Sequence, residues 1–178
     1  MLEFFKENNL FPIFVTIVGW VVVHYLSANR ANKAQEAATN VSYCSHLLNE
    51  MKSIKYQEVD IYKKTYLYIK RDAGIAFNDS GMQDLAVDMK TLRGAFASLI
   101  RANSCYLGGI STDLDTIKSR IKQMHTIITG EDMRGIDITN RMPILQKLYD
   151  LHESLSSLFT NVETKISIGD IKIDKSIK

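Results

Sequence analysis

Histidine and cysteine, two residue types common in catalytic and metal sites, are few in this sequence. The chain of 178 residues has 4 histidines and 2 cysteines, and the cysteines, Cys44 and Cys105, are too far apart for a zinc or redox motif. A Gly-rich phosphate loop, a Glu-x-x-His pair and a nucleophile elbow are missing from the sequence. The acidic residues between 131 and 137 lack the ligand spacing of a calcium loop. The sequence therefore predicts no cofactor and no metal.

One pair of residues has a spacing that is used in catalysis. Arg120 and His125 are separated by four residues within a predicted helix. This R-x4-H spacing is similar to the motif of the HEPN ribonucleases, a family of helical bundles. The resemblance implies that Arg120 binds an RNA phosphate and that His125 moves a proton. The competing interpretation is a solvated helix face, because Ile121, directly after the arginine, lies on the predicted core stripe.

Lysines and tyrosines alternate in the segment KSIKYQEVDIYKKTYLYIKR, which includes Lys63, Lys64 and Arg71. Basic groups beside aromatic rings can bind single-stranded nucleic acid or anionic lipid headgroups. Two acidic residues interrupt the basic patch, which favours a lipid or protein contact over nucleic acid. The alternative is an ordinary bundle helix with half-buried tyrosines and solvated lysines.

A long apolar run near the N-terminus is the strongest signal in the sequence. No ionised side chain occurs from Asn8 to Asn29, a length that spans about 33 Å as a helix and matches a hydrocarbon core of roughly 30 Å. We therefore expect a short tail over residues 1–9 and a transmembrane helix over residues 10–27. A buried core segment and a cleaved signal peptide are the alternatives; Glu3 and Glu7 argue against the signal peptide.

The flanking charges indicate an orientation for this helix. Arg30 and Lys33 follow the run, whereas Lys6 is the one basic side chain before it. Positively charged flanks favour the cytoplasmic side. We expect the large C-terminal part of the chain to lie in the cytoplasm.

Residues 28–167 show helical periodicity throughout, and residues 168–178 form a predicted flexible tail. Small residues recur at Ala31, Ala34 and Ala38, where another backbone can approach closely. Further stripes at three- and four-residue steps are predicted to face the core: Val41, Cys44, Leu48 and Met51; Val59, Tyr62, Tyr66 and Ile69; the coiled-coil-like Met82, Leu85, Met89, Leu92, Phe96 and Leu99; Leu114, Ile117, Ile121, Met124 and Ile128; and Leu145, Leu148, Leu151, Leu155, Leu158, Val162 and Ile166.

Cap residues indicate where these helices begin and end. Ser80 and Gln83 have the capping-box spacing, Ser111 to Asp113 are cap candidates, and Gly130 is a predicted stop. Strand patterns are almost absent. The predicted fold class is all-α: an N-terminal transmembrane helix that continues into an antiparallel helical bundle.

The boundary of the predicted anchor, GWVVVHYLSANR, resembles that of a loose group of small bacterial single-pass membrane proteins with no established activity. The resemblance implies a bacterial inner-membrane location. Gly19, Trp20, His24 and Tyr25 in this stretch are candidates for membrane or partner contacts.

We expect a membrane-anchored interaction or scaffold module without catalytic activity. Its expected partners are the lipid bilayer and either a second copy of the chain or another protein, and we expect neither nucleic acid nor a small-molecule substrate. The alternatives are a membrane-disrupting effector of a bacterial defence or toxin system and a HEPN-like ribonuclease that uses Arg120 and His125.

Overall fold

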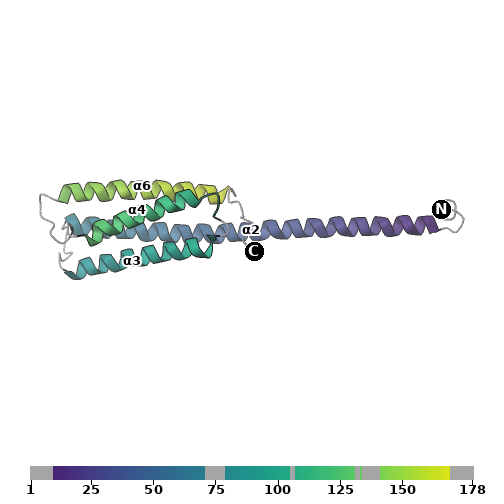
Figure 1. Cartoon of the computed structure of the whole chain (residues 1–178), viewed down its shortest axis with the longest axis horizontal. Helices are drawn as coiled ribbons and strands as arrows, with labels where there is room; N and C mark the ends of the chain where they lie inside the picture. Colours follow the sequence, from purple (N-terminus) through teal and green to yellow (C-terminus); the bar gives the residue numbers. More distant parts are fainter. Residues whose placement is uncertain (1–9, 71–78, 105–106, 131–132, 134–140, 169–178) are drawn as a thin grey trace. The chain divides into compact units, whose positions relative to one another are not determined.

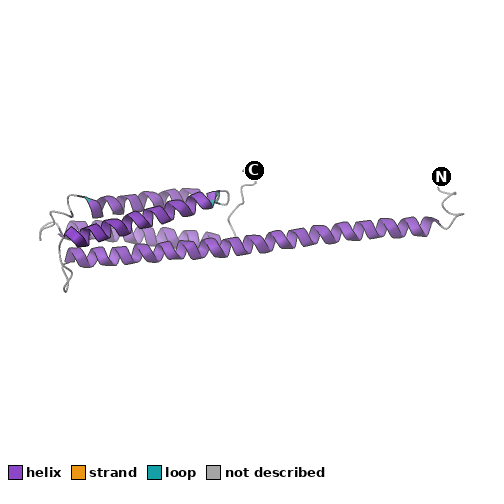
Figure 2. Ribbon diagram, turned by 90° about the horizontal axis from the view of Figure 1, so that it is seen from below, coloured by secondary structure: helices purple, strands orange, loops and turns teal. Residues whose placement is uncertain are grey.

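The computed structural model describes residues 10–70, 79–104, 107–130, 133 and 141–168. Four helices account for nearly all of these residues, and the described ranges contain no strand (Figure 2). The helices are α2 (Leu10–Lys70), α3 (Asp79–Ala102), α4 (Ser111–Thr129) and α6 (Arg141–Ser167), as labelled in Figure 1. The predicted all-α class is confirmed.

The chain divides into two compact units, Met1–Tyr43 and Cys44–Lys178, and the division falls within α2. In the first unit, the described residues belong to the N-terminal part of α2. The predicted tail over residues 1–9 lies outside the described residues, and so does the C-terminal tail after Ile168.

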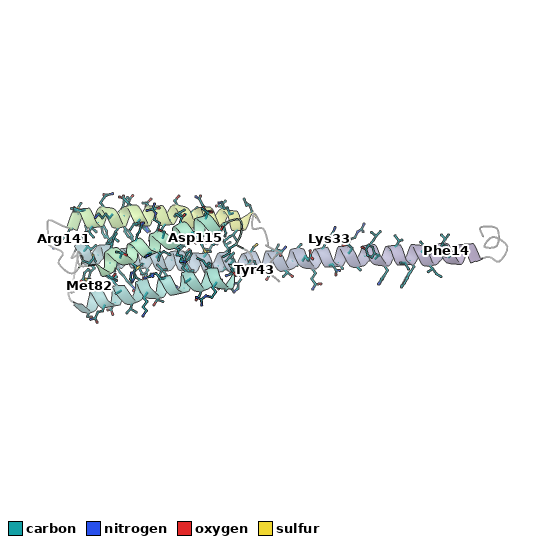
Figure 3. The ribbon with its side chains drawn as sticks, in the orientation of Figure 1. Phe14, Lys33, Tyr43, Met82, Asp115 and Arg141 are labelled. Carbon is teal, nitrogen blue, oxygen red and sulfur yellow. The ribbon has the colours of Figure 1, made fainter. Side chains whose placement is uncertain are left out.

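The second unit is an antiparallel bundle of α3, α4, α6 and the C-terminal part of α2. Helix α4 packs against both α3 and α6. Lys64 of α2 pairs with Asp88 of α3, and Lys55 of α2 pairs with Glu163 of α6. Figure 3 places Met82 and Arg141, near the starts of α3 and α6, at the same end of the bundle. Consecutive helices therefore alternate in direction and lie side by side, as the sequence predicts.

The core confirms most of the predicted stripes. All five predicted residues of α4 are buried, and so are those of α3 except Met82, which is half-buried. In α6, Phe159 is fully buried where Leu158 was the predicted core residue. The Phe159 ring meets the Phe96 ring edge to face, with centroids 6.4 Å apart. This aromatic contact joins α3 and α6 across the middle of the bundle.

The predicted stripe of α2 is largely wrong. Val41 is 70% exposed, and Val59, Tyr62 and Tyr66 are only half-buried. Of the predicted residues, Met51 and Ile69 are buried. Apart from Ile69, the buried residues of α2 form a continuous heptad series, here called the α2 seam: Leu47, Met51, Ile54, Glu58, Ile61, Thr65 and Tyr68. Two of its seven positions, Glu58 and Thr65, carry polar side chains, so the spacing of apolar residues alone does not indicate this heptad series.

Helix ends agree with the prediction at one site and differ at two. Gly130 follows the last residue of α4 and is its C-cap, as predicted. The N-cap of α4 is Ile110, which makes no side-chain cap hydrogen bond, so the predicted Ser111–Asp113 caps are wrong. Asp113 instead binds Lys165 of α6. Ser80 lies inside α3, which begins at Asp79, and therefore does not precede the helix as a cap would.

Candidate functional site

The N-terminal part of α2 exposes apolar side chains on every side of the helix. Ten large hydrophobic residues between Phe14 and Leu26 are each 43% to 70% exposed. They occupy nearly consecutive positions, so they cannot share one face of a helix with 3.6 residues per turn. Figure 3 shows these side chains pointing away from the helix on both sides. A surface of this kind is typical of a helix that meets an apolar environment or several partners.

Over the residues whose side chains are described, no helix combines the length and the mean hydropathy that crossing a membrane requires.

The residues predicted for membrane or partner contacts lie on this exposed part of α2. The Trp20 and His24 rings stack, with centroids 5.3 Å apart and planes 10° from parallel. Trp20 and Tyr25 are 67% and 70% exposed, and a Cβ added at Gly19 would meet nothing within 4 Å. The stack covers one face of the Trp20 ring and one face of the His24 ring. Most of the surface of Trp20 and of Tyr25 remains exposed and can contact other molecules.

The small residues of the predicted stripe are also exposed. Ala31, Ala34 and Ala38 lie on α2 before the bundle, and all three are classed as exposed. They follow one another at steps of three and four residues, which places them on one side of the helix.

Within the bundle, the most unusual group is a buried carboxylate paired with an imidazole. Glu58 occupies the central position of the α2 seam and its side chain is fully buried. Nδ1 of His152 in α6 lies 3.0 Å and 3.2 Å from the two carboxylate oxygens of Glu58. The Tyr62 ring stacks on a face of the His152 ring, with centroids 4.1 Å apart and planes 6° from parallel. The imidazole thus contacts a carboxylate through its edge and an aromatic ring through its face.

Burial and pairing shift the titration of both partners. Burial raises the pKa of Glu58 above its usual 4.5, and the hydrogen bond and charge of His152 oppose that shift without cancelling it. The hydrogen bond to Glu58 raises the pKa of His152 above 6.5, against the effect of its own burial. Glu153 also raises the pKa of His152, and Lys63 lowers it. The pair therefore retains a proton at the α2–α6 interface to a higher pH than a free imidazole does.

The candidate catalytic residues Arg120 and His125 are not brought together. His125 is five positions after Arg120 along α4, which rotates the two side chains about 140° apart around the helix axis. Nη1 of Arg120 donates to Oε1 of Gln123, 3.1 Å away. The pKa of His125 is lowered by burial and, secondly, by the charge of Arg93 in α3. The cation that affects the pKa of His125 is thus Arg93 on α3, whereas Arg120 is hydrogen-bonded to Gln123.

The basic residues of the Tyr-rich segment are used in different ways. Nζ of Lys64 lies 2.8 Å from Asp60 and 3.0 Å from Asp88, and these hydrogen bonds raise the pKa of the lysine. Lys63 is exposed, and Arg71 lies outside the described residues. Lys64 therefore ties α2 to α3 within the chain.

The sequence interpretation missed the Glu58–His152 pair. Ninety-four positions separate the two residues, and no local motif links them. One feature of the sequence indicates a buried charged site here: Glu58 lies one helical turn after Ile54, at a position where a heptad pattern expects an apolar core residue. The described residues contain no cluster of three or more His, Cys, Asp or Glu side chains able to hold a metal ion. Cys44 is a half-buried free thiol, and Cys105 lies outside the described residues.

Comparison of the chain with protein-family models, with curated proteins and with solved structures finds no match.

Proposed function

We propose that this chain is a membrane-anchored helical scaffold, with a transmembrane helix over residues 10–27 and a bundle that presents contact surfaces on the cytoplasmic side of a bacterial inner membrane. The observation that carries the proposal is the all-round apolar surface of α2 between Phe14 and Leu26. The role involves no catalysis.

The chemistry of this surface favours lipid over water. In lipid every backbone polar group must be satisfied internally, and a helix does this without partners. The charge-free run also extends in the sequence to Asn8, ahead of the first described side chain. From Asn8 to Asn29 it is long enough to cross roughly 30 Å of hydrocarbon.

The charged flanks support the orientation. Arg30 and Lys33 follow the run on the side of the bundle, and both are exposed. Lysine and arginine close to a membrane helix are retained in the cytoplasm. The bundle would then lie on the cytoplasmic side.

The scaffold part of the proposal rests on exposed small residues next to the apolar surface. Ala31, Ala34 and Ala38 share one side of α2, and each is exposed. Small side chains allow two helix backbones to approach closely. We propose a second copy of the chain as the partner on this side.

The anchor is tested by placing two charges in the apolar surface. In the variant V18K/V22K each lysine costs about 2.5–3.5 kcal/mol at the centre of a membrane helix, so the protein should leave the membrane fraction. The measurement is resistance to extraction by alkaline carbonate, with folding checked by circular dichroism. The control is V41K, at an apolar position that is 70% exposed but lies outside the charge-free run. Extraction of the unaltered protein by carbonate would contradict the anchor.

The self-association is tested separately. A31L/A38L places two leucines on the small-residue side of α2, whereas N29L/N40L places two leucines on the opposite side. In a mild detergent, sedimentation should show that the first variant loses the oligomer and the second retains it. An unaltered protein that sediments as a monomer would overturn the scaffold and leave the anchor standing.

A further inference from the structure

A groove of about 580 Å³ lies between α3 and α4, and its walls are strongly basic. Four cations line it, Lys90, Arg93, Lys118 and Lys122, together with the single carboxylate of Asp115. The whole chain carries a net charge of only +2, so this groove concentrates positive charge locally. Its volume is within the range of small-molecule sites, roughly 300–1,000 Å³.

The helical repeat aligns these cations. On each helix the lining residues occupy positions i, i+3, i+4 and i+7 of one face: Lys90, Arg93, Gly94 and Ala97 on α3, and Asp115, Lys118, Ser119 and Lys122 on α4. Each set spans two helical turns, or about 10 Å. The floor is apolar and closed, because Phe96 and Ile121 are each only 1% exposed.

Gly94 keeps the middle of the groove open. A Cβ added at this position would meet nothing within 4 Å. Glycine costs about 1 kcal/mol relative to alanine inside a helix, and no close approach in the fold requires it here. Any larger side chain would project into the groove, and the glycine leaves this space free.

Within the described residues, the four cations of the groove have no side-chain partner, unlike three lysines elsewhere in the bundle. Lys55, Lys64 and Lys165 each pair with a carboxylate of the chain. Within the described part of the chain, no side-chain hydrogen bond or ion pair engages the four cations of the groove. The charge of Arg93 helps to lower the pKa of His125, after the larger effect of burial. The four cations around this groove repel one another, and an anion bound in the groove would reduce that repulsion.

We propose that the α3–α4 groove binds a compact oligophosphate, a small ligand with two or more linked phosphate groups. Arginine forms paired hydrogen bonds with phosphate oxygens, and lysine supplies point charges. The Ser119 hydroxyl lines the same groove and can donate to a phosphate oxygen. This ligand class departs from the expectation that the chain takes no small molecule.

The groove favours a small phosphate ligand over a nucleic acid strand. Strand-binding grooves stack bases on exposed aromatic rings. The one aromatic residue that lines this groove, Phe96, is buried beneath it. The two cations on each helix also lie within about one turn of each other, which suits a short ligand.

The test is calorimetric titration of the full chain, in an uncharged detergent, with inorganic tripolyphosphate. We expect saturable binding that weakens as salt increases. Removing two cations in R93Q/K122Q should weaken binding by about tenfold or more, since each charge-assisted hydrogen bond is worth about 1.5–3 kcal/mol and 1.4 kcal/mol is a factor of ten. The charge-matched control K52Q/R101Q removes two exposed cations elsewhere and should leave binding within about twofold, because distant exposed charges are screened.

A second variant separates the groove from general charge. G94L fills the groove, retains every charge and replaces glycine with a better helix former. It should raise the melting temperature and still lose tripolyphosphate binding. Unchanged binding in G94L, or equal loss in the two charge variants, would overturn the proposal. Tighter binding of a single-stranded oligonucleotide or of anionic vesicles through the same residues would also overturn it, in favour of that ligand.

Discussion

Nδ1 of His152 lies 3.0 Å from Oε1 of Glu58, and the carboxylate is completely enclosed by the bundle. Glu58 lies on α2 and His152 on the antiparallel helix α6. The positions before and after Glu58 in the α2 seam are the apolar residues Ile54 and Ile61, so this ionisable pair lies within an otherwise apolar part of the core. A buried pair of this kind contributes little net stability when it is intact, but either partner alone is costly.

Removing one partner of the pair should therefore cost more than removing both. E58L leaves the imidazole without its partner, and H152L leaves a buried carboxylate; each should lower the free energy of unfolding by about 3–5 kcal/mol. The double variant E58L/H152L should regain most of this loss, because no uncompensated charge remains. Urea unfolding of the full chain in mild detergent measures the cycle, and strictly additive losses would contradict the coupling.

The exposed ion pairs give a matched comparison. Lys64 bridges Asp60 and Asp88, but about half of its side chain is exposed. K64A should change the free energy of unfolding by less than about 1 kcal/mol. If K64A lowered the free energy of unfolding as much as E58L does, burial would not be what determines the cost of breaking an ion pair in this bundle.

The bundle should be more stable in mild acid than in alkali. The folded pKa of His152 is raised above 6.5, so its contribution is complete below that value and is lost as the pH rises through the folded pKa. The folded pKa of Glu58 is also raised, above 4.5, so ionising this buried carboxyl destabilises the fold as the pH rises. Both shifts have the same sign. Unfolding measured from about pH 5.5 to about pH 8.5, the range in which histidine titrates, should show falling stability.

Two variants locate this pH dependence. E58L/H152F removes both titrating groups of the pair and keeps a ring that can still stack on Tyr62, so it should flatten the decrease. H46Q changes a histidine whose side chain is 73% exposed beside Glu50, and the decrease should remain. A flat profile in the unaltered protein would contradict the assignment.

The aromatic contact between Phe96 and Phe159 should dominate the packing energy at the bundle centre. Both rings are almost fully buried and meet at 84°. F159A should cost about 3–5 kcal/mol through lost transfer energy and the cavity left behind. V87A, at a residue of α3 that is 61% exposed, is the control and should change stability little. Thermal unfolding followed by circular dichroism measures both.

The same substitution at two glycines should have opposite effects. G94A adds a methyl group in open space within α3 and should stabilise the helix by about 1 kcal/mol. G130A would place its Cβ 2.8 Å from the backbone oxygen of Thr126, so the end of α4 must shift, at a cost of about 1–3 kcal/mol. The melting temperatures of the two variants should therefore move in opposite directions from that of the unaltered protein.

Local periodicity predicts a helix well only where the buried positions are uniformly apolar. The stripes of α3 and α4 are of this kind, and the structure buries them as predicted except for the half-buried Met82. In α6, Leu158 and Phe159 are neighbouring apolar residues, and periodicity alone cannot decide which faces the core. In α2 the polar residues Glu58 and Thr65 interrupt the pattern, and most of the residues predicted to be buried there are not.

The sequence by itself determined the helical class, the extent of the charge-free run and most of the core of three helices. Each of these depends on residues that are neighbours along the chain, within the 3.6-residue repeat. The tertiary structure decided the rotation and register of the helices, which pair Glu58 with His152 and bring Lys90 and Arg93 beside Lys118 and Lys122. Such contacts depend on how every core side chain packs at once, so no single segment carries the information.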